Sequence, residues 1–216
     1  MMNLASYIDH TLLRPDSTDE EITRLCEEAI QFGFYSVCIP PYFVRKCKKL
    51  LVGSPVKICT VIGFPYGYSY TPAKVEEARR AMDEGVHEID MVINLIALQH
   101  GDLNYLRNEL TSVCTMVQLK GGIIKVILET GLLSAEQIET GCKLCADLNV
   151  DYVKTSTGVN GPGANEEVIR QLRKLLPKGV RIKASGGIKN RQQAEKLIAA
   201  GADRIGSSAS VQIVSQ

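Results

Sequence analysis

Residues 151–158 of this 216-residue chain read Asp-Tyr-Val-Lys-Thr-Ser-Thr-Gly. The segment begins as a short apolar strand pattern and runs into a polar loop that ends in glycine. Comparable runs of β-branched and apolar residues recur along the chain at intervals of roughly 20 to 35 residues, the length of one strand and one crossover helix. The eight expected strands cover residues 7–11, 36–39, 57–61, 88–92, 123–128, 152–155, 181–184 and 204–206.

Amphipathic segments with helix start signals separate these strands. Residues 18–21 (Thr-Asp-Glu-Glu) form a capping box before an apolar face that begins at Ile22. Residues 71–72 (Thr-Pro) predict a cap followed by proline at the first helical position. Residues 134–137 and 190–193 repeat the spacing of a cap and a Glu or Gln three positions later. Strands that alternate with helices indicate a parallel sheet.

A parallel sheet of eight strands can close into a barrel or remain open and doubly wound. Ionisable residues near the ends of several strands favour the barrel, because barrel active sites collect there. No G-x-G-x-x-G follows the first strand, which removes support for the dinucleotide-binding form of the open sheet. We therefore predict an α/β fold, a single (β/α)8 TIM barrel with an eight-stranded parallel sheet, as one domain spanning residues 1–216.

Composition argues against several classes of partner. The chain has 25 Lys plus Arg against 24 Asp plus Glu, so no strong net field attracts nucleic acid or a membrane surface. No apolar run approaches the roughly 18 residues that a spanning helix needs, and residues 1–6 lack a signal-peptide pattern. The seven scattered cysteines are interpreted as buried thiols, although Cys142 and Cys145 form an isolated C-x-x-C. We expect a cytoplasmic protein.

Lys154 lies at the carboxyl end of an expected strand, where barrel enzymes carry out their chemistry. On its own it could be a lysine that reaches solvent from a strand end. Lys183 lies in the next strand, about 4.8 Å away, so two inward-facing side chains would bring their amines together. Proximity disfavours two charges and should lower the pKa of one lysine, as imine formation requires. A pair of salt-bridge lysines is the alternative.

Asp90 interrupts the apolar strand at residues 88–92. A carboxylate that alternation turns into the barrel is costly unless it is paired. The available cations are Lys125, Lys154 and Lys183. Asp90 is therefore a candidate for proton transfer during imine formation and hydrolysis, with a buried structural ion pair as the alternative.

Glycine-rich loops follow the seventh and eighth strands, at residues 185–188 and 205–209. Barrel enzymes often bind phosphate at these loops, because glycines let backbone N–H groups point at an anion. Together with the loop after the sixth strand, they predict phosphate-binding residues Thr157, Gly158, Gly186, Gly187, Gly206, Ser207 and Ser208.

The chain resembles the deoxyribose-phosphate aldolase family over nearly its whole length, and the matching stretches occur in the family's order and spacing. They are residues 8–13 (IDHTLL), 36–39 (SVCI), 61–65 (VIGFP), 88–94 (EIDMVIN), 125–131 (KVILETG), 153–158 (VKTSTG), 183–188 (KASGGI) and 204–208 (RIGSS). One departure is Ala209, where many relatives have a further serine.

The resemblance implies a class I (Schiff-base) aldolase, a carbon–carbon lyase of carbohydrate degradation that cleaves 2-deoxy-D-ribose 5-phosphate to acetaldehyde and D-glyceraldehyde 3-phosphate. By the same resemblance, Lys154 forms the imine, Lys183 tunes it and Asp90 transfers protons. The resemblance also implies supporting roles: Lys125 positions Asp90, Asp9 and Thr11 line the sugar pocket, and Cys38 lies near that pocket.

No cofactor and no metal is expected, because the iminium does what a zinc ion does in the other aldolase class. The three histidines, at positions 10, 87 and 100, lack zinc-ligand spacing. The expected partners are a small sugar phosphate and further copies of the chain, as a homodimer or higher homo-oligomer.

Two other interpretations stay open. Another lysine-imine barrel enzyme, such as a transaldolase-like or longer-sugar aldolase, would keep Lys154 and change the substrate. A catalytically silent sugar-phosphate-binding barrel is also possible, since a fold alone never proves chemistry. Asp90, Lys154 and Lys183 argue against the silent form, because a binding protein has little reason to keep three ionisable groups in a costly interior.

Overall fold

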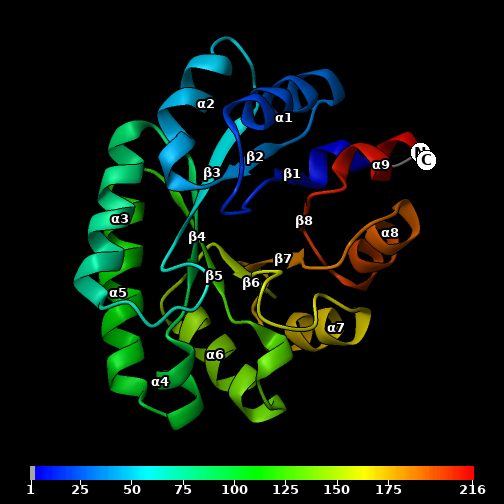
Figure 1. Cartoon of the computed structure of the whole chain (residues 1–216). Coiled ribbons are helices and arrows are strands. Elements are labelled where there is room, and N and C mark those ends of the chain that lie inside the picture. The colour runs from blue at the N-terminus through cyan, green and yellow to red at the C-terminus, as the bar shows by residue number, and fades with distance from the viewer. Residues whose placement is uncertain (1–2) are drawn as a thin grey trace.

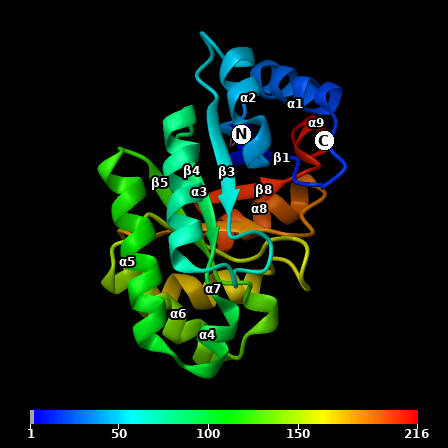
Figure 2. The ribbon, with the colours of Figure 1, turned by 60° about the vertical axis from the view of Figure 1, so that its left-hand side comes forward.

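The computed structural model describes residues 3–216, in which eight parallel strands close into a barrel in chain order (Figures 1 and 2). The predicted (β/α)8 fold is confirmed. Met1 and Met2, the first residues of the predicted domain and of the expected signal-free N-terminus, lie outside the described residues. The strands are β1 (Ile8–Thr11), β2 (Ser36–Ile39), β3 (Lys57–Ile62), β4 (Glu88–Val92), β5 (Ile123–Ile127), β6 (Tyr152–Lys154), β7 (Arg181–Ser185) and β8 (Arg204–Ser207).

Helices surround the barrel and connect successive strands (Figure 1). In the described chain they are α1 (Asp19–Phe32), α2 (Val44–Leu50), α3 (Thr71–Glu84), α4 (Leu95–His100), α5 (Leu103–Leu119), α6 (Ala135–Asp147), α7 (Glu166–Leu175), α8 (Arg191–Ala200) and α9 (Ser210–Ser215), with 3-10 turns η1 (Leu4–Tyr7), η2 (Pro41–Phe43) and η3 (Thr130–Leu132). None of these helices combines the length and hydrophobicity that a membrane crossing requires.

Several predicted boundaries shift by one residue at the strand ends. β6 ends at Lys154, and Tyr7 belongs to η1 rather than to β1. β7 and β8 continue to Ser185 and Ser207, because both serines pair with residues of neighbouring strands. Serine lowers the strand propensity of a segment, but the backbone ladder of a closed barrel decides where the strand ends.

Local capping explains where most of the helices begin. The Thr18 and Ser134 side chains complete capping boxes, as predicted. The prediction that Thr71 caps α3 is wrong: Thr71 is the first helical residue, and Tyr70 precedes the helix without a side-chain cap. Pro72 in the first turn still favours the helical backbone, because its fixed φ suits a position that needs no N–H partner.

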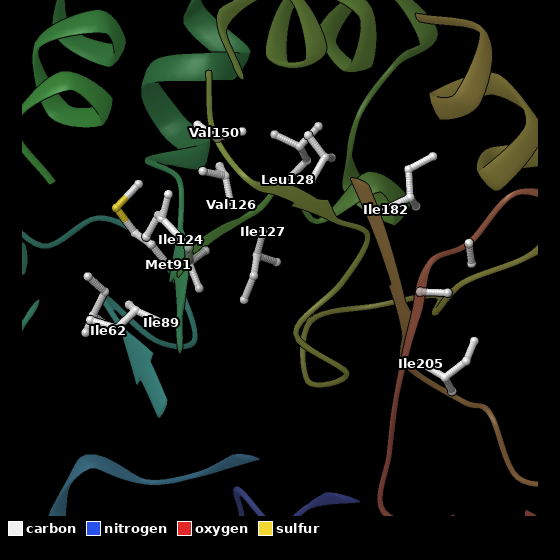
Figure 3. Packing of buried hydrophobic residues seen from close by; sticks show 14 of the residues in the cluster. Ile62, Ile89, Met91, Ile124, Val126, Ile127, Leu128, Val150, Ile182 and Ile205 are labelled. Atoms are coloured by element: carbon white, nitrogen blue, oxygen red, sulfur yellow. The ribbon is translucent and has the colours of Figure 1, made fainter. Parts of the chain in front are cut away.

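The apolar core lies between the outside of the barrel and the surrounding helices. On β4, Ile89 and Met91 point outward and pack beside Ile124 and Val126 of β5 (Figure 3). The alternate positions of β4, which include Glu88 and Asp90, point inward. One face of this strand therefore packs against the helices, and the other face supplies carboxylates to the barrel interior. The barrel interior is therefore the charged region of the fold.

Candidate active site

Strand register brings Lys154 and Lys183 together at the carboxyl half of the barrel. The two lysines are direct partners in the β6–β7 pairing, and Asp90 is the partner of Lys125 in the β4–β5 pairing. All four side chains lie almost completely buried. The expectation that these residues face one another inside the barrel agrees with this geometry.

Asp90 is the acceptor that joins the three lysines. Its Oδ2 accepts from Lys154 Nζ and from Lys183 Nζ, each at 2.8 Å. Its Oδ1 accepts from Lys125 Nζ at 2.8 Å. A single carboxylate therefore holds both predicted reaction lysines at one oxygen and fixes its own orientation through the third lysine.

A second layer of charges lies next to this group. Asp9 contacts Lys183 Nζ and accepts from Arg204 at 2.8 Å. Glu88 contacts Lys125 Nζ at 2.6 Å and Arg204 at 3.3 Å. We call the seven buried charged residues of both layers the interior cluster: Asp9, Glu88, Asp90, Lys125, Lys154, Lys183 and Arg204.

The pKa shifts in the interior cluster favour ions over neutral groups. Burial alone would raise the pKa of Asp90, but the neighbouring Lys125, Lys154 and Lys183 outweigh burial and hold that pKa well below its ordinary value. Burial alone would lower the pKa of Lys183, but Asp9 and Asp90 raise it above its ordinary value. The pKa of Lys125 is raised in the same way, with Asp90 as the largest favourable influence.

A cavity of about 650 Å³ opens onto this cluster at the carboxyl ends of the strands. Of the cluster, Lys154 lines the cavity. Thr11 at the end of β1 lines it too, as do all the predicted phosphate residues, which lie at the ends of β6, β7 and β8 or in the loops that follow: Thr157, Gly158, Gly186, Gly187, Gly206, Ser207 and Ser208. The cavity therefore connects an amine at its base with glycine-rich backbone at its side.

Two predicted pocket residues lie beneath the cavity and do not line it. Asp9 is fully buried, and its carboxylate contacts Lys183 and Arg204. Cys38 is fully buried beside Cys59 and Val61. The resemblance implied that Asp9 lines the sugar pocket and that Cys38 lies near it, but the parallel register turns both toward the barrel axis, and neither lines the cavity.

The glycine-rich loops pack backbone against backbone. A side chain at Gly163 would lie 2.0 Å from the carbonyl oxygen of Gly186, and Gly186 and Gly187 have φ values of 92° and 75°. Only glycine fits such a contact, and it adopts this left-handed backbone without strain. The Ser207 hydroxyl donates to Ile188 O and accepts from the Ala209 N–H, so both groups are already engaged within the fold.

Several residues that the sequence did not single out contribute to the site. Arg14 and Lys189 line the cavity, and Arg14 pairs with Glu21 on α1. Arg204 and Glu88 complete the interior cluster. The sequence carried a signal for the last two, since both are charged residues in otherwise apolar strands.

Two sets of buried side chains bring potential metal-ligating atoms within 4.8 Å: Cys38, Cys59 and Asp90, and Asp9, Cys59 and Glu88. Both sets are already contacted by ammonium groups. Lys125 Nζ lies 3.2 Å from Cys59 Sγ and 2.8 Å from Asp90 Oδ1. A divalent cation would have to replace these lysines at a site that already carries more cations than carboxylates.

The sequence matches the family model described as DeoC/LacD family aldolase over residues 3–210. The chain belongs to this aldolase family. Deoxyribose-phosphate aldolase of Thermococcus gammatolerans is 46% identical over 215 residues, covering 99% of this chain and 96% of that protein. The Brevibacillus brevis enzyme of the same name is 48% identical over 214 residues, with 99% and 96% coverage.

A solved structure agrees with these sequence comparisons. The tetrameric deoxyribose phosphate aldolase of Aeropyrum pernix superposes with a TM-score of 0.91 at 34% identity, covering 98% of this chain and 89% of that chain. The family, the fold and the interior cluster all agree with an aldolase that carries its reactive groups at the carboxyl ends of barrel strands.

Proposed function

We propose that this aldolase cleaves 2-deoxy-D-ribose 5-phosphate to acetaldehyde and D-glyceraldehyde 3-phosphate through an imine on Lys154. The observation that carries the proposal is that Lys154 alone of the interior cluster lines the cavity, while its amine shares Asp90 Oδ2 with Lys183. Similarity over the full chain to proteins named deoxyribose-phosphate aldolase supports this substrate.

The three lysines of the interior cluster differ in the number of carboxylates that they contact. The cluster holds four basic side chains and three carboxylates. Lys183 contacts both Asp9 and Asp90, and Lys125 contacts both Glu88 and Asp90. Lys154 contacts Asp90 alone. Lys154 therefore has the fewest carboxylate partners of the three lysines, and it is the one that lines the cavity, where its nitrogen can meet a carbonyl group.

The cleavage then follows from an amine at the base of the cavity. Lys154 Nζ attacks C1 of the open-chain aldehyde, and the carbinolamine loses water to give an iminium. Loss of the C3 hydroxyl proton breaks the C2–C3 bond and sends its electron pair to the iminium, which releases D-glyceraldehyde 3-phosphate. The enamine takes a proton at C2, and water hydrolyses the resulting iminium to acetaldehyde and free Lys154.

Asp90 is suited to pass protons on during these steps. Its Oδ2 lies 2.8 Å from Lys154 Nζ, within the distance that proton transfer requires. Although burial opposes it, the three lysines keep the pKa of Asp90 well below its ordinary value, so the group returns to the carboxylate after each transfer. Lys183 keeps a positive charge beside the reacting nitrogen throughout the cycle.

The phosphate group would lie at the other end of the cavity. Gly158, Gly186 and Gly187 line that end with left-handed backbone, which exposes N–H groups. Arg14 and Lys189 line the same cavity and can balance the charge of a phosphate dianion. Because the Ser207 hydroxyl and the Ala209 N–H are engaged with each other, Ser208 is the serine available to the ligand.

The proposal also covers the oligomeric state and the cellular compartment of the protein. We propose a homo-oligomer, supported by the tetramer described for the Aeropyrum pernix relative. Light scattering on the purified protein measures this directly. All seven cysteines are free thiols in the described fold, which supports a reducing compartment such as the cytoplasm.

Borohydride trapping tests the reaction and the residue together. The protein is incubated with deoxyribose 5-phosphate and sodium borohydride, and its peptides are mapped by mass spectrometry. We expect a stable adduct on the peptide that carries Lys154 and none in a Lys154→Met variant. An adduct elsewhere would overturn the assignment, and rapid cleavage of a ketose phosphate without cleavage of deoxyribose 5-phosphate would favour a transaldolase-like enzyme.

A further inference from the structure

Glu129 lies just beyond the end of β5 in an unusual backbone conformation. Its φ is 56° and its ψ is 55°, in the left-handed region that non-glycine residues rarely adopt. This conformation costs about 1 kcal/mol or more for a residue with a Cβ atom. The strain persists only where surrounding contacts hold the residue, and such residues cluster at functional sites.

The Glu129 carboxylate is buried and its partners are uncharged. Only 1% of the residue is exposed. Its two oxygens accept from the Thr157 N–H at 3.1 and 3.2 Å, and Oε2 also accepts from the Thr157 hydroxyl. Asn160 Nδ2 lies 3.5 Å from the same oxygen. A buried carboxylate without a cation is costly, so its hydrogen bonds must be worth the burial.

These contacts all go to one loop, the segment of residues 155–163 that follows β6. Thr157, Gly158 and Val159 of this loop line the cavity, whereas Glu129 does not. Asn160 also donates to Pro65 O at 2.8 Å, which ties the loop to the end of β3. Glu129 thus contacts a loop that lines the cavity without lining the cavity itself.

The neighbours of Glu129 continue the same junction. The Thr130 N–H donates to Thr155 O at 2.9 Å. A side chain at Gly131 would lie 2.7 Å from Pro162 O, so the two loops touch through their backbones. The Thr157 hydroxyl, bonded to Glu129, accepts in turn from the Val159 N–H at 3.1 Å.

We propose that Glu129 is a positioning residue that sets the β6–α7 loop at the phosphate end of the cavity. With Glu129 in place, its carboxylate engages both the Thr157 N–H and the Thr157 hydroxyl, and the left-handed Gly158 follows at the cavity wall. This role rests on the proposed function, since it assigns that loop to the phosphate of the substrate. Glu129 acts through the loop and does not touch the reacting atoms.

Kinetics with and without the phosphate group test this role. Wild type, Glu129→Gln and Glu109→Gln are compared on deoxyribose 5-phosphate and on deoxyribose. Glu109 is the control for losing a buried carboxylate elsewhere: it is equally buried, accepts a backbone N–H and pairs with Lys74 away from the cavity, so Glu109→Gln lowers stability without touching the β6–α7 loop. Glu129→Gln should lower kcat/KM for the phosphate ester about tenfold, mainly through KM, and for deoxyribose less than threefold. Glu109→Gln should change both substrates by the same factor.

A second variant keeps the test decisive if Glu129→Gln folds poorly. Glu129→Gly removes the carboxylate and also removes the backbone strain at φ 56°. It should fold and should show the larger loss of preference for the phosphate ester. An unchanged preference in these variants, whether activity is normal or falls equally for both substrates, overturns the positioning role.

Calorimetry with inorganic phosphate separates this role from the proposed reaction. We expect wild type and Glu109→Gln to bind phosphate alike, and Glu129→Gln to bind it about tenfold more weakly. If wild type bound phosphate without cleaving deoxyribose 5-phosphate, the proposed function would fail and the calorimetric contrast would still decide the role of Glu129. Absence of phosphate binding in wild type, or equal affinity in all three proteins, overturns it.

Discussion

Two groups of buried charged residues in this molecule differ in the balance of positive and negative charges and in their access to the cavity. Between α3 and α5, Lys74 Nζ lies 2.7 Å from Glu109 Oε1, and both side chains are fully buried. Lys74 also donates to Val92 O, and Glu109 accepts from the Asn94 N–H. This pair is one cation with one anion, and neither residue lines the cavity. The interior cluster has one cation more than it has carboxylates and opens onto the cavity through Lys154.

The pKa shifts of the two groups run in opposite directions. In the α3–α5 pair burial dominates: it lowers the pKa of Lys74 and raises that of Glu109 despite their attraction. In the interior cluster burial is again the largest single influence, but several opposite charges together exceed it and push Asp90 and Lys125 further toward their ions. The attraction of one partner therefore does not outweigh burial in the α3–α5 pair, whereas the several opposite charges of the interior cluster do outweigh it.

The largest expected effect is at the amine that lines the cavity. Lys154→Leu should lower turnover of deoxyribose 5-phosphate by about four orders of magnitude or more, since no other amine of the cluster faces the cavity. The fold should persist, because three cations then face three carboxylates. Steady-state assays and thermal unfolding measure both outcomes. Substantial residual cleavage would mean that Lys154 is not the amine that forms the imine.

The next largest effect is expected at Lys183, whose amine shares an Asp90 oxygen with Lys154. Lys183→Leu should cut turnover by at least about a hundredfold at neutral pH, because Lys183 donates to the same Asp90 oxygen as Lys154 and places a positive charge beside the reacting nitrogen. Steady-state assays at neutral pH measure this loss. Full activity of the variant would show that Lys183 does not assist the reaction at Lys154.

A second substitution, at Asp9, tests whether the charge count of the interior cluster affects the rate. Asp9 contacts Lys183 and Arg204 and does not line the cavity. Adding Asp9→Asn to Lys183→Leu restores an excess of one cation and should recover part of the lost rate at neutral pH. Asp9→Asn alone serves as the control. A double variant slower than Lys183→Leu would indicate that geometry, not charge count, explains the loss.

Much of the barrel could be predicted from the sequence because each strand carries a local signal. The alternation at residues 88–92 gave both the outward Ile89 and Met91 and the inward Asp90. Spacing of strands with capped helices indicated the parallel sheet, and ionisable residues at the strand ends favoured its closure. Lys154 and Lys183 could be predicted as neighbours because consecutive strands of such a sheet pair in order.

The remaining site residues depend on contacts between distant segments. Lys74 lies in a helix rich in charged residues, so nothing local distinguishes it from the solvent-exposed face, yet it is fully buried against α5. Glu129 depends on a left-handed backbone and on a loop 28 residues further along the chain. Arg14 enters the cavity only because β1 pairs with β8 when the barrel closes. The positions of these side chains depend on tertiary contacts formed when the barrel closes, and local sequence propensity does not predict such contacts.

The α3–α5 pair should matter for stability and little for catalysis. Lys74→Met leaves the Glu109 carboxylate buried without its cation and should cost about 3–5 kcal/mol of unfolding free energy. The double variant Lys74→Met with Glu109→Leu should regain most of that loss. Urea unfolding gives the free energies, and kcat of each folded variant should stay within tenfold of wild type. A stable Lys74→Met protein with a hundredfold lower kcat would place the pair in the catalytic apparatus and break the contrast with the cluster.

The smallest expected effect is on the pH dependence of stability. As the solution becomes acidic, the contributions of the two groups to stability change in opposite directions. The pKa of Glu109 is raised above its ordinary 4.5, so between 4.5 and that raised value the folded protein binds more protons than the unfolded chain. Stability contributed by Glu109 therefore increases as pH falls through this window, by up to about 1.4 kcal/mol per pH unit. The pKa values of Asp9 and Asp90 are lowered, so their contribution persists above their ordinary 3.8 and is lost only below it.

Unfolding free energies of wild type and of the Lys74→Met, Glu109→Leu double variant, measured between pH 7 and pH 3, separate the two contributions. Wild type should gain on the double variant as pH falls toward 4.5, because only wild type carries the carboxyl whose pKa is raised. Both should lose stability together below pH 3.8, where the unfolded chain takes up protons that Asp90 in the interior cluster resists. A wild type that loses stability relative to the double variant above pH 4.5 would mean that attraction, not burial, governs the α3–α5 pair, as it does the interior cluster.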